Sequence, residues 1–450
     1  MNMRISDKTL SLILRLLLLL VPMSVVTFES KGAKIAGISR AEADSLGRET
    51  VVYDGLPVTF NTLSRDLMKK VYGKENYRGL TAEQTVASMR LFPVEWKDEP
   101  IILVKDRDLR ERLGATRKYL SLSSLFTSDG TYKVPALYDN ADEKGQREIM
   151  ELDEKVGILL QIISGDIIVK DDKVKLPEWR IDLELFYNHI PFLKIIFILL
   201  FSGAIISLVF HLGAGSIGRR IDLLLIRVFS GCSFVVALIN FTLEWILAGR
   251  IPLSNMGETL SFTVLAGTGL TLFLSLWKGG KSGGNVVMYI AGMLFWGCVG
   301  LVSYLIGENP VITPLMPALQ SPWLSIHVTL VMISYALLAL TFVISIIGVC
   351  SPSGSDRLRK ECMTMLYPGV GFLAAGIVMG SLWAKEAWGA YWSWDPKETC
   401  ALVSLIAYSV PICVRLRGRW LYVYLLFAFF TVLTTYFGVN YFLGGRHSYV

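Results

Sequence analysis

The pattern of hydrophobic and polar positions divides the chain near residue 190. Beyond it, long apolar runs alternate with short polar loops, at 193–212, 223–247, 257–277, 286–306, 323–349, 364–382, 399–414 and 420–439. About 20 apolar residues is the length that a helix needs to cross a bilayer. The hydrophobic content of 53% agrees with a chain that lies mostly in a membrane. The pattern therefore predicts an all-α polytopic membrane protein with about eight transmembrane helices in this part of the chain.

The first part of the chain combines a shorter apolar run with a long polar region. The run at 10–28 is typical of a signal peptide, but no small-x-small cleavage site follows it, which favours a retained anchor. Residues 31–185 carry most of the charge, and short extended runs alternate with helical patterns. Thr81 and Gln84 form a capping box that predicts a helix start, and 142–163 is a second predicted helix. The predicted domains are an N-terminal anchor or signal segment at 1–29, a small extracytoplasmic α/β domain at 30–190 and a transmembrane domain at 191–450.

The net charge of +6 does not by itself indicate a nucleic-acid partner, because the basic residues have a topological explanation. They gather in every second loop between the apolar runs: Arg219 and Arg220, Lys278 and Lys281, Arg357, Arg359 and Lys360, and Arg415, Arg417 and Arg419. The positive-inside rule places such loops in the cytoplasm. We therefore predict contact with membrane lipid and not with nucleic acid, and we place the alternate connections outside the cytoplasm.

An aromatic stretch lies in one of these outer connections, at residues 383–398, with the sequence WAKEAWGAYWSWDPKE. It contains four tryptophans: Trp383, Trp388, Trp392 and Trp394. An N-cap at Asp395, a proline at the next position and a capping-box Glu398 predict that a helix begins there. Aromatic belts also form at membrane surfaces, but they are spread over many helix ends. The concentration in one loop therefore favours a flat, exposed surface on which a large planar ligand lies.

Two of the four histidines are predicted to lie on the same side as this stretch. His327 is near the outer end of the helix that follows Ser321 and Pro322, and His447 comes just after the last apolar run. Imidazole is a common axial ligand of haem iron. The alternatives are a hydrogen-bonded core histidine for His327 and an uninvolved tail residue for His447. Their shared side with the aromatic stretch favours ligation of a haem iron by both.

These motifs together resemble the cytochrome c assembly family of haem-handling membrane proteins, of the CcsA type of System II. The resemblance covers roughly Arg250 to Val450 and rests on four stretches, GRIPLSNMGETLSF, PLMPALQSPWLSIHVTLVMISYALL, WGAYWSWDPKE and GGRHSYV. It implies that haem b is held at the outer membrane face by the tryptophan-rich WWD motif and two histidines, and is then attached to the CxxCH thiols of apocytochrome c. The site residues that it implies are His327 and His447 as metal ligands, and Trp383, Trp388, Trp392, Trp394 and Asp395 as the surface that binds the porphyrin.

One position departs from the family pattern. Similar proteins carry a histidine near the cytoplasmic end of the helix after the tryptophans, for an intramembrane haem site, where this chain has Cys413. His211 is either a compensating ligand or a solvated helix-end histidine, so the internal site is left open. The region before residue 190 more weakly resembles the ResB/CcsB-type partner, which implies a partial fusion that works with a membrane partner of that type.

Charged residues near the outer ends of the runs need partners, because an unpaired charge in a membrane is costly. Arg250 is predicted to pair with Glu244 or Glu258 at the outer vestibule. Three external cations are predicted to bind either haem propionates or lipid headgroups: Lys385, Lys397 and Arg446.

The apolar pattern and the resemblance together imply a multi-pass protein of the bacterial inner (cytoplasmic) membrane, with its haem site and its soluble domain facing the periplasm. It would present haem for covalent thioether attachment to apocytochrome c. No side chain is assigned as catalytic, and whether the chain is a cytochrome c synthase with a partner subunit is left open. Two alternatives are a haem exporter or holdase that passes haem to another ligase, and a structural or transport membrane protein without haem.

Overall fold

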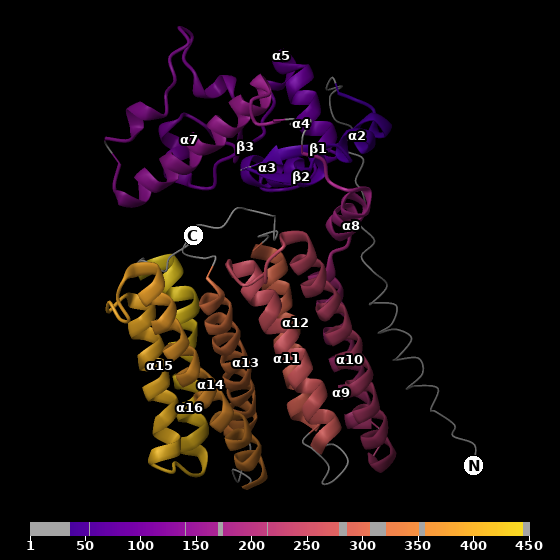
Figure 1. Cartoon of the computed structure of the whole chain (residues 1–450), viewed down its shortest axis with the longest axis vertical. Helices are drawn as coiled ribbons and strands as arrows, with labels where there is room; N and C mark the ends of the chain where they lie inside the picture. The colour runs from indigo at the N-terminus through magenta and orange to yellow at the C-terminus, as the bar shows by residue number, and fades with distance from the viewer. Residues whose placement is uncertain are drawn as a thin grey trace, which may run out of the picture. The chain divides into compact units, whose positions relative to one another are not determined.

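The computed structural model describes residues 37–53, 55–139, 141–169, 174–213, 215–278, 286–306, 321–350 and 356–443. The predicted segment at 1–29 and the predicted ligand His447 lie outside the described residues. The chain divides into two compact units (Figure 1). We call them the N-terminal unit, which is mainly Pro22–Ile190, and the helical unit, which is mainly Pro191–Pro310 and Leu315–Val450.

The N-terminal unit is mostly helical, with two small sheets. Its elements are α2 (Arg40–Gly47), β1 (Thr50–Tyr53), β2 (Leu56–Thr59), α3 (Phe60–Tyr72), α4 (Ala82–Leu91), α5 (Pro93–Trp96), β3 (Ile102–Leu103), α6 (Arg107–Arg112), β4 (Tyr119–Leu120), the 3-10 turns η1 (Ser123–Leu125) and η2 (Pro135–Leu137), α7 (Glu143–Ser164) and α8 (Glu178–His189). β1 pairs antiparallel with β2, and β3 pairs antiparallel with β4. The predicted helix starts are confirmed, since Thr81 and Gln84 form a capping box and Asp142 caps α7.

Apolar side chains from α3, α4 and α7 form the core of this unit. Leu63, Val86 and Leu159 are almost fully buried, and removal of such surface from water is the main force that stabilises a soluble domain. α8 is tied to the same unit by a buried carboxylate. Glu184 accepts hydrogen bonds from the backbone N–H of Thr59 at 3.0 Å and from its hydroxyl at 2.8 Å.

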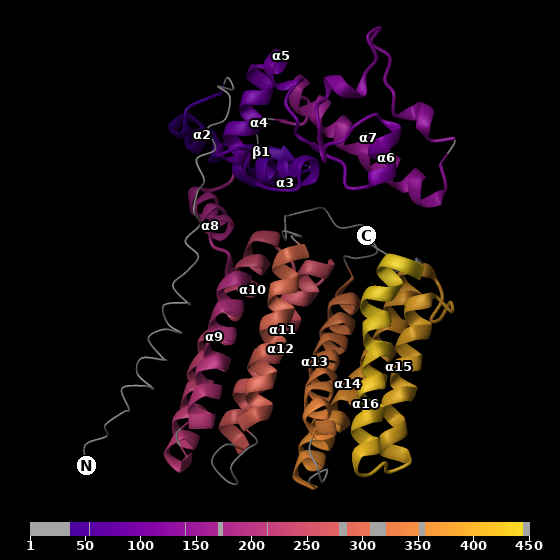
Figure 2. The same cartoon turned by 180° about the vertical axis from the view of Figure 1, so that it is seen from behind.

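The helical unit contains a helix at each predicted apolar run (Figures 1 and 2). They are α9 (Phe192–Gly213), α10 (Gly215–Ala248), α11 (Met256–Lys278), α12 (Val286–Ile306), α13 (Pro322–Cys350), α14 (Asp356–Trp388), α15 (Pro396–Cys413) and α16 (Arg419–Leu433), which continues as the π-helix η4 (Thr434–Leu443). Among the described residues, seven helices are long and apolar enough to cross a membrane. α15 is not one of them, since its 18 residues begin with a polar turn. The chain is thus a multi-pass membrane protein, as predicted.

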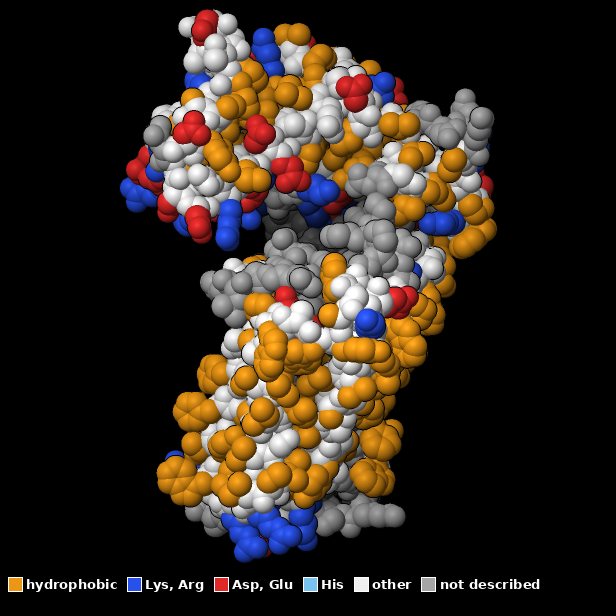
Figure 3. All heavy atoms as spheres, turned by 60° about the vertical axis from the view of Figure 1, so that its left-hand side comes forward, with side chains coloured by type: hydrophobic (Ala, Val, Ile, Leu, Met, Phe, Trp, Pro, Cys, Tyr) orange, Lys and Arg blue, Asp and Glu red, His pale blue; other side chains and the backbone are white. Residues whose placement is uncertain are grey.

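The surface of the helical unit agrees with this assignment. Figure 3 shows hydrophobic side chains over the sides of the helices and lysine and arginine side chains gathered at one end. Phe427 and Phe430 of α16 are 68% and 60% exposed, as expected for side chains that face lipid. Arg415 and Arg417 lie in the loop that joins α15 to α16.

Glycines bring α14 close to α13. A Cβ atom added at Gly376 would lie 2.7 Å from the Val331 side chain, and one added at Gly380 would lie 2.7 Å from the His327 ring. Gly376 and Gly380 form a small-xxx-small pattern, which lets membrane helices pack with their backbones in close approach. The glycine face of α14 therefore determines where the His327 ring lies.

Candidate functional site

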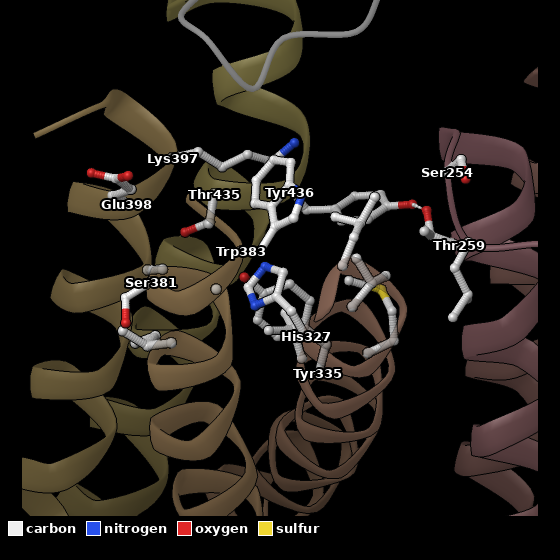
Figure 4. Close-up of a pocket in the computed structure, with 18 of the residues that line it drawn as sticks. Ser254, Thr259, His327, Tyr335, Ser381, Trp383, Lys397, Glu398, Thr435 and Tyr436 are labelled. Carbon is white, nitrogen blue, oxygen red and sulfur yellow. Dashed lines mark hydrogen bonds between the residues drawn. The ribbon is translucent and has the colours of Figure 1, made fainter. Parts of the chain in front are cut away.

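A pocket lies at the end of the helical unit where α14 ends and α15 begins. It is enclosed by α11 and the loop before it, α13, α14, the loop that joins α14 to α15, α15 and η4 (Figure 4). Its empty volume is about 1230 Å³, a figure that includes open solvent at its mouth. The predicted site residues that line it are His327, Trp383 and Trp392, together with the predicted cation Lys397.

His327 is held in a fixed orientation on the pocket wall. Its Nδ1 atom lies 2.7 Å from the carbonyl oxygen of Gly376, which can only accept a hydrogen bond. Nδ1 must therefore carry the proton, and in the neutral ring the lone pair is on Nε2. Metal-binding histidines commonly donate their other N–H to a carbonyl group in this way. The arrangement suits ligation of a metal by Nε2.

The four tryptophans do not share one exposed surface, which corrects the expectation of a flat platform. α14 continues to Trp388 instead of ending before residue 383, so Trp383 is a helical residue that is 1% exposed and packs on Leu324. Trp383 and Trp392 line the pocket. Trp388 is 37% exposed and Trp394 is 71% exposed, and neither belongs to the pocket wall. Two of the four tryptophan rings thus contribute to the pocket wall.

Asp395 is the N-cap of α15, as predicted, and is buried. Its carboxylate accepts a hydrogen bond from the backbone N–H of Lys397 at 3.1 Å. Glu398 completes the capping box and accepts from the backbone N–H groups of Ser393 at 2.8 Å and Asp395 at 3.3 Å. Trp394, just before the cap, has a left-handed backbone with φ of 58°, which is strained for a bulky residue. Both carboxylates therefore hold the turn that enters α15.

Lys397 is the predicted cation that faces the pocket. Its Nζ atom donates to Oδ1 of Asn440 at 2.9 Å. It lies in the first turn of α15, outside the seven candidate spans, and burial lowers the pKa of its ammonium to about 8. Lys385 instead donates to the Gly389 carbonyl at 2.8 Å and lies over the Tyr391 ring at 5.5 Å. Arg446 lies outside the described residues.

An ion pair shapes the part of the pocket wall that comes from α11 and the loop before it. The Arg250 guanidinium donates to both oxygens of Glu258, at 3.0 and 2.9 Å, and so Arg250 pairs with Glu258 of the two predicted partners. Glu258 is buried and also accepts from the backbone N–H of Ser254 at 2.7 Å. Glu244 accepts from Asn240 at 2.8 Å. Since bidentate charged hydrogen bonds fix geometry well, this pair positions the loop before α11 as part of the pocket.

Sequence reasoning missed the contribution of η4. The Tyr436 hydroxyl lies 2.7 Å from the Thr259 hydroxyl and donates to the Met256 carbonyl at 3.1 Å, so it connects η4 to α11 (Figure 4). π-helical turns are rare and are frequent at functional sites. The apolar pattern of this segment gave no signal of the change from α16 to a π-helix, and Asn440 was missed for the same reason.

Two further predicted positions lie apart from the pocket. His211 Nδ1 is 2.9 Å from Oδ2 of Asp222, which is fully buried, so this histidine is hydrogen-bonded to a carboxylate. Cys413 is exposed and ends α15, whereas Lys397 is in its first turn. The internal haem site stays a prediction. The second external ligand, His447, also stays a prediction.

Comparison with known proteins gives a consistent result for the helical unit. The family model described as cytochrome C assembly protein matches residues 226–447. The chain is 33% identical over 243 residues to the cytochrome c biogenesis protein CcsA of Chlamydomonas reinhardtii, covering 50% of this chain and 67% of that protein. It is 30% identical over 273 residues to CcsA of Prochlorococcus marinus, covering 49% and 85%.

A third relative extends into the N-terminal unit. Protein NrfI of Wolinella succinogenes is 23% identical over 483 residues, covering 86% of this chain. The match covers 52% of NrfI, so the chain spans about half the length of that relative. The CcsA matches therefore concern about half of this chain, and the NrfI match concerns most of it.

Proposed function

The chain belongs to the family of cytochrome c assembly proteins and has a role in cytochrome c biogenesis, and from this premise we propose that it holds haem in the pocket beside His327. In this proposal the chain presents haem on the outer side of a bacterial inner membrane for thioether attachment to apocytochrome c. The observation that carries the proposal is the His327 ring, which a backbone carbonyl fixes in the tautomer that can bind iron.

The residues of the pocket fit haem in three respects. First, His327 supplies an imidazole, a standard axial ligand of haem iron. Second, the walls on either side of it include apolar side chains, among them Val331 and Ile377, as a porphyrin ring requires. Third, the Trp383 and Trp392 rings supply aromatic surface, and Lys397 supplies a positive charge for acidic substituents.

The task of the chain in this proposal is mainly positioning. Bound haem supplies the vinyl groups to which the cysteine thiols of a CxxCH motif add. His327 would hold the iron, the apolar walls would exclude water from the ring, and the fixed geometry would raise the rate through proximity and orientation. A ResB/CcsB-type membrane protein would act as its partner, and His447 would supply the second ligand.

The test is the absorption spectrum of the purified full chain in detergent, with haem added. We expect a Soret band in the wild type that shifts or disappears in His327→Ala. His189→Ala is the matched control, since His189 is exposed and outside the pocket wall. A wild type that binds no haem, or a His327→Ala variant with the wild-type spectrum, would refute the proposal.

A second experiment separates attachment from carriage. Haem-loaded protein is incubated with reduced apocytochrome c, with and without the membrane partner, and covalent haem is measured on a denaturing gel. Thioether formation would identify a synthase. Transfer of haem without covalent attachment would identify a carrier that hands haem to another ligase.

A further inference from the structure

We propose that Tyr436 is a gate residue of the pocket. Its hydroxyl bonds to α11 hold the pocket closed between α11 and η4, and a broad ligand enters when these bonds break. This inference adds an entry step to the proposed function and rests on that function only for the identity of the ligand. The observations that support it are the bonds of Tyr436 across the pocket, the fixed position of its partners and the π-helical form of η4.

The Tyr436 side chain spans the pocket from one helix to another. It starts on η4, and its hydroxyl lies 2.7 Å from the Thr259 hydroxyl of α11 and donates to the Met256 carbonyl at 3.1 Å. Figure 4 shows this crossing, with His327 on the wall of the same pocket. One turn further along η4, the Tyr441 hydroxyl donates to Sδ of Met256 at 3.4 Å. Two tyrosines therefore join η4 to the first turn of α11.

The partners on α11 are held in place by other contacts. Glu258, in the first turn of α11, binds the Arg250 guanidinium with both carboxylate oxygens, and its backbone N–H donates to Oδ1 of Asn255 at 2.8 Å. Met256 and Glu258 are buried. Because a bidentate charged pair fixes geometry well, this end of α11 is the fixed side of the contact. We therefore expect the movement that opens the gate on the side of η4.

η4 is the element that can change. It is π-helical over Thr434–Leu443, and π-helical turns are rare and are frequent at functional sites. Gly438 lies near its middle, and glycine makes a helix less stable than alanine does. A π-turn holds more residues than an α-turn, so conversion between the two forms rotates the side chains about the helix axis. Conversion next to Tyr436 would turn its hydroxyl away from α11, which gives the pocket a closed and an open form.

The gate matters for a broad, flat ligand. The pocket receives walls from α11 and from η4, and Tyr436 and His327 both line it. A porphyrin that lies against His327 extends toward both walls, and the Tyr436 ring crosses the space between them (Figure 4). Entry therefore requires the ring to move, and the hydroxyl bonds that form again afterwards slow release. The same bonds limit the association rate and the dissociation rate.

The first experiment measures the gate without a ligand. Amide hydrogen exchange of residues 434–443 is followed by mass spectrometry in the purified full chain, for the wild type, Tyr436→Phe and Thr259→Val. Each variant removes one hydroxyl with little change of shape. Loss of one hydrogen bond corresponds to about 2- to 12-fold in an equilibrium constant, so exchange in η4 should be faster by this factor. Tyr424→Phe is the matched control, since it removes an α16 hydroxyl that donates to the Ala407 carbonyl at 2.9 Å, outside the pocket wall.

The second experiment measures entry of haem. Haem is mixed with the same proteins in detergent, and the rates of association and dissociation are taken from the Soret change. We expect Tyr436→Phe to raise both rates by about the same factor, so that Kd changes less than either rate. Tyr424→Phe should keep the wild-type rates. A merely structural defect at the site would weaken binding without faster association.

The outcomes separate this inference from the proposed function. Exchange in η4 that neither Tyr436→Phe nor Thr259→Val changes, or an association rate that Tyr436→Phe does not raise, would overturn the gate. In both cases a spectrum that still depends on His327 would leave the haem site itself intact. If the wild type binds no haem, the proposed function fails, and exchange alone decides the gate: faster exchange in both variants supports it, and unchanged exchange overturns it.

Discussion

Replacing Gly380 with alanine tests whether the close approach of α13 and α14 sets the position of His327. The added Cβ atom would lie 2.7 Å from both Nδ1 and Cε1 of the ring. Carbon contacts are normally about 3.5–4.0 Å, so the ring or the helix must move by about 1 Å. The ring cannot turn away without weakening its hydrogen bond to the Gly376 carbonyl at 2.7 Å. Either movement changes the direction in which Nε2 faces the pocket.

The expected cost follows from the same contacts. Overpacking of a well-packed interface costs about 1–3 kcal/mol, and the loss of one hydrogen bond costs about 0.5–1.5 kcal/mol. Alanine in place of glycine stabilises a helix by about 1 kcal/mol, which offsets part of this cost. We therefore expect Gly380→Ala to lower the free energy of unfolding by about 0.5–3.5 kcal/mol.

Gly371→Ala is the matched control on the same helix. A Cβ atom at Gly371 meets nothing within 4 Å, so this variant should be as stable as the wild type or more stable, by up to about 1 kcal/mol. Both variants are purified in detergent, and thermal unfolding and the haem absorption spectrum are measured. Gly380→Ala should unfold at a lower temperature and show an altered Soret band. If Gly380→Ala matched Gly371→Ala in both measurements, the reasoning about the His327 contact would be wrong.

Three other predictions follow from the site. Arg250→Met leaves the buried Glu258 carboxylate without its bidentate partner and should lower the free energy of unfolding by about 3–5 kcal/mol. The double variant with Glu258→Met should recover part of this loss, and no recovery would contradict the ion-pair explanation. Asp395→Ala removes the N-cap of α15 and should lower the free energy of unfolding by about 0.5–2 kcal/mol. Asp395→Asn keeps a capping oxygen, so equal effects of the two variants on thermal unfolding would argue against capping. Because burial lowers the pKa of Lys397 to about 8, its ammonium is charged below that pH and neutral above it. If this ammonium attracts the propionates of haem, as proposed above, the preference for haem over its dimethyl ester, which has no free carboxylates, should fall from pH ~7 to pH ~9. Binding of the ester serves as the control for the other titratable groups at this site, which are His327, Tyr335, Tyr391, Asp395, Glu398 and Tyr436. A preference that does not change with pH would contradict the role of Lys397.

The helices of the helical unit could be predicted because the membrane restricts what a chain can do. In a bilayer every backbone polar group needs an internal partner, so a long apolar run becomes a helix. The ends of the helices were harder to predict. α14 continues to Trp388, six residues past the apolar run that ends at residue 382, because no residue in that segment breaks a helix. The start of α15 was predictable, since a capping box is a local signal.

The pocket itself could not be predicted, because it depends on contacts between distant segments. Tyr436 and Thr259 are 177 positions apart, and the sequence contains no local pattern that pairs them. The small-xxx-small pattern at Gly376 and Gly380 is visible in the sequence, and it predicts a close helix contact without naming the partner. The chain therefore indicated the chemistry of the site, and tertiary structure decided which residues line it.

The residues WDPKE combine two tasks that the sequence shows as one motif. Asp395 and Glu398 fix the first turn of α15 through backbone hydrogen bonds. Lys397 lies in that turn and faces the pocket. Because the cap determines where the turn begins, a variant that loses the cap should also displace the ammonium group, even though neither carboxylate contacts the substrate in our proposal. The haem-to-ester preference of Asp395→Ala should therefore fall with its stability, whereas an unchanged preference would show that the cap and the cation act independently.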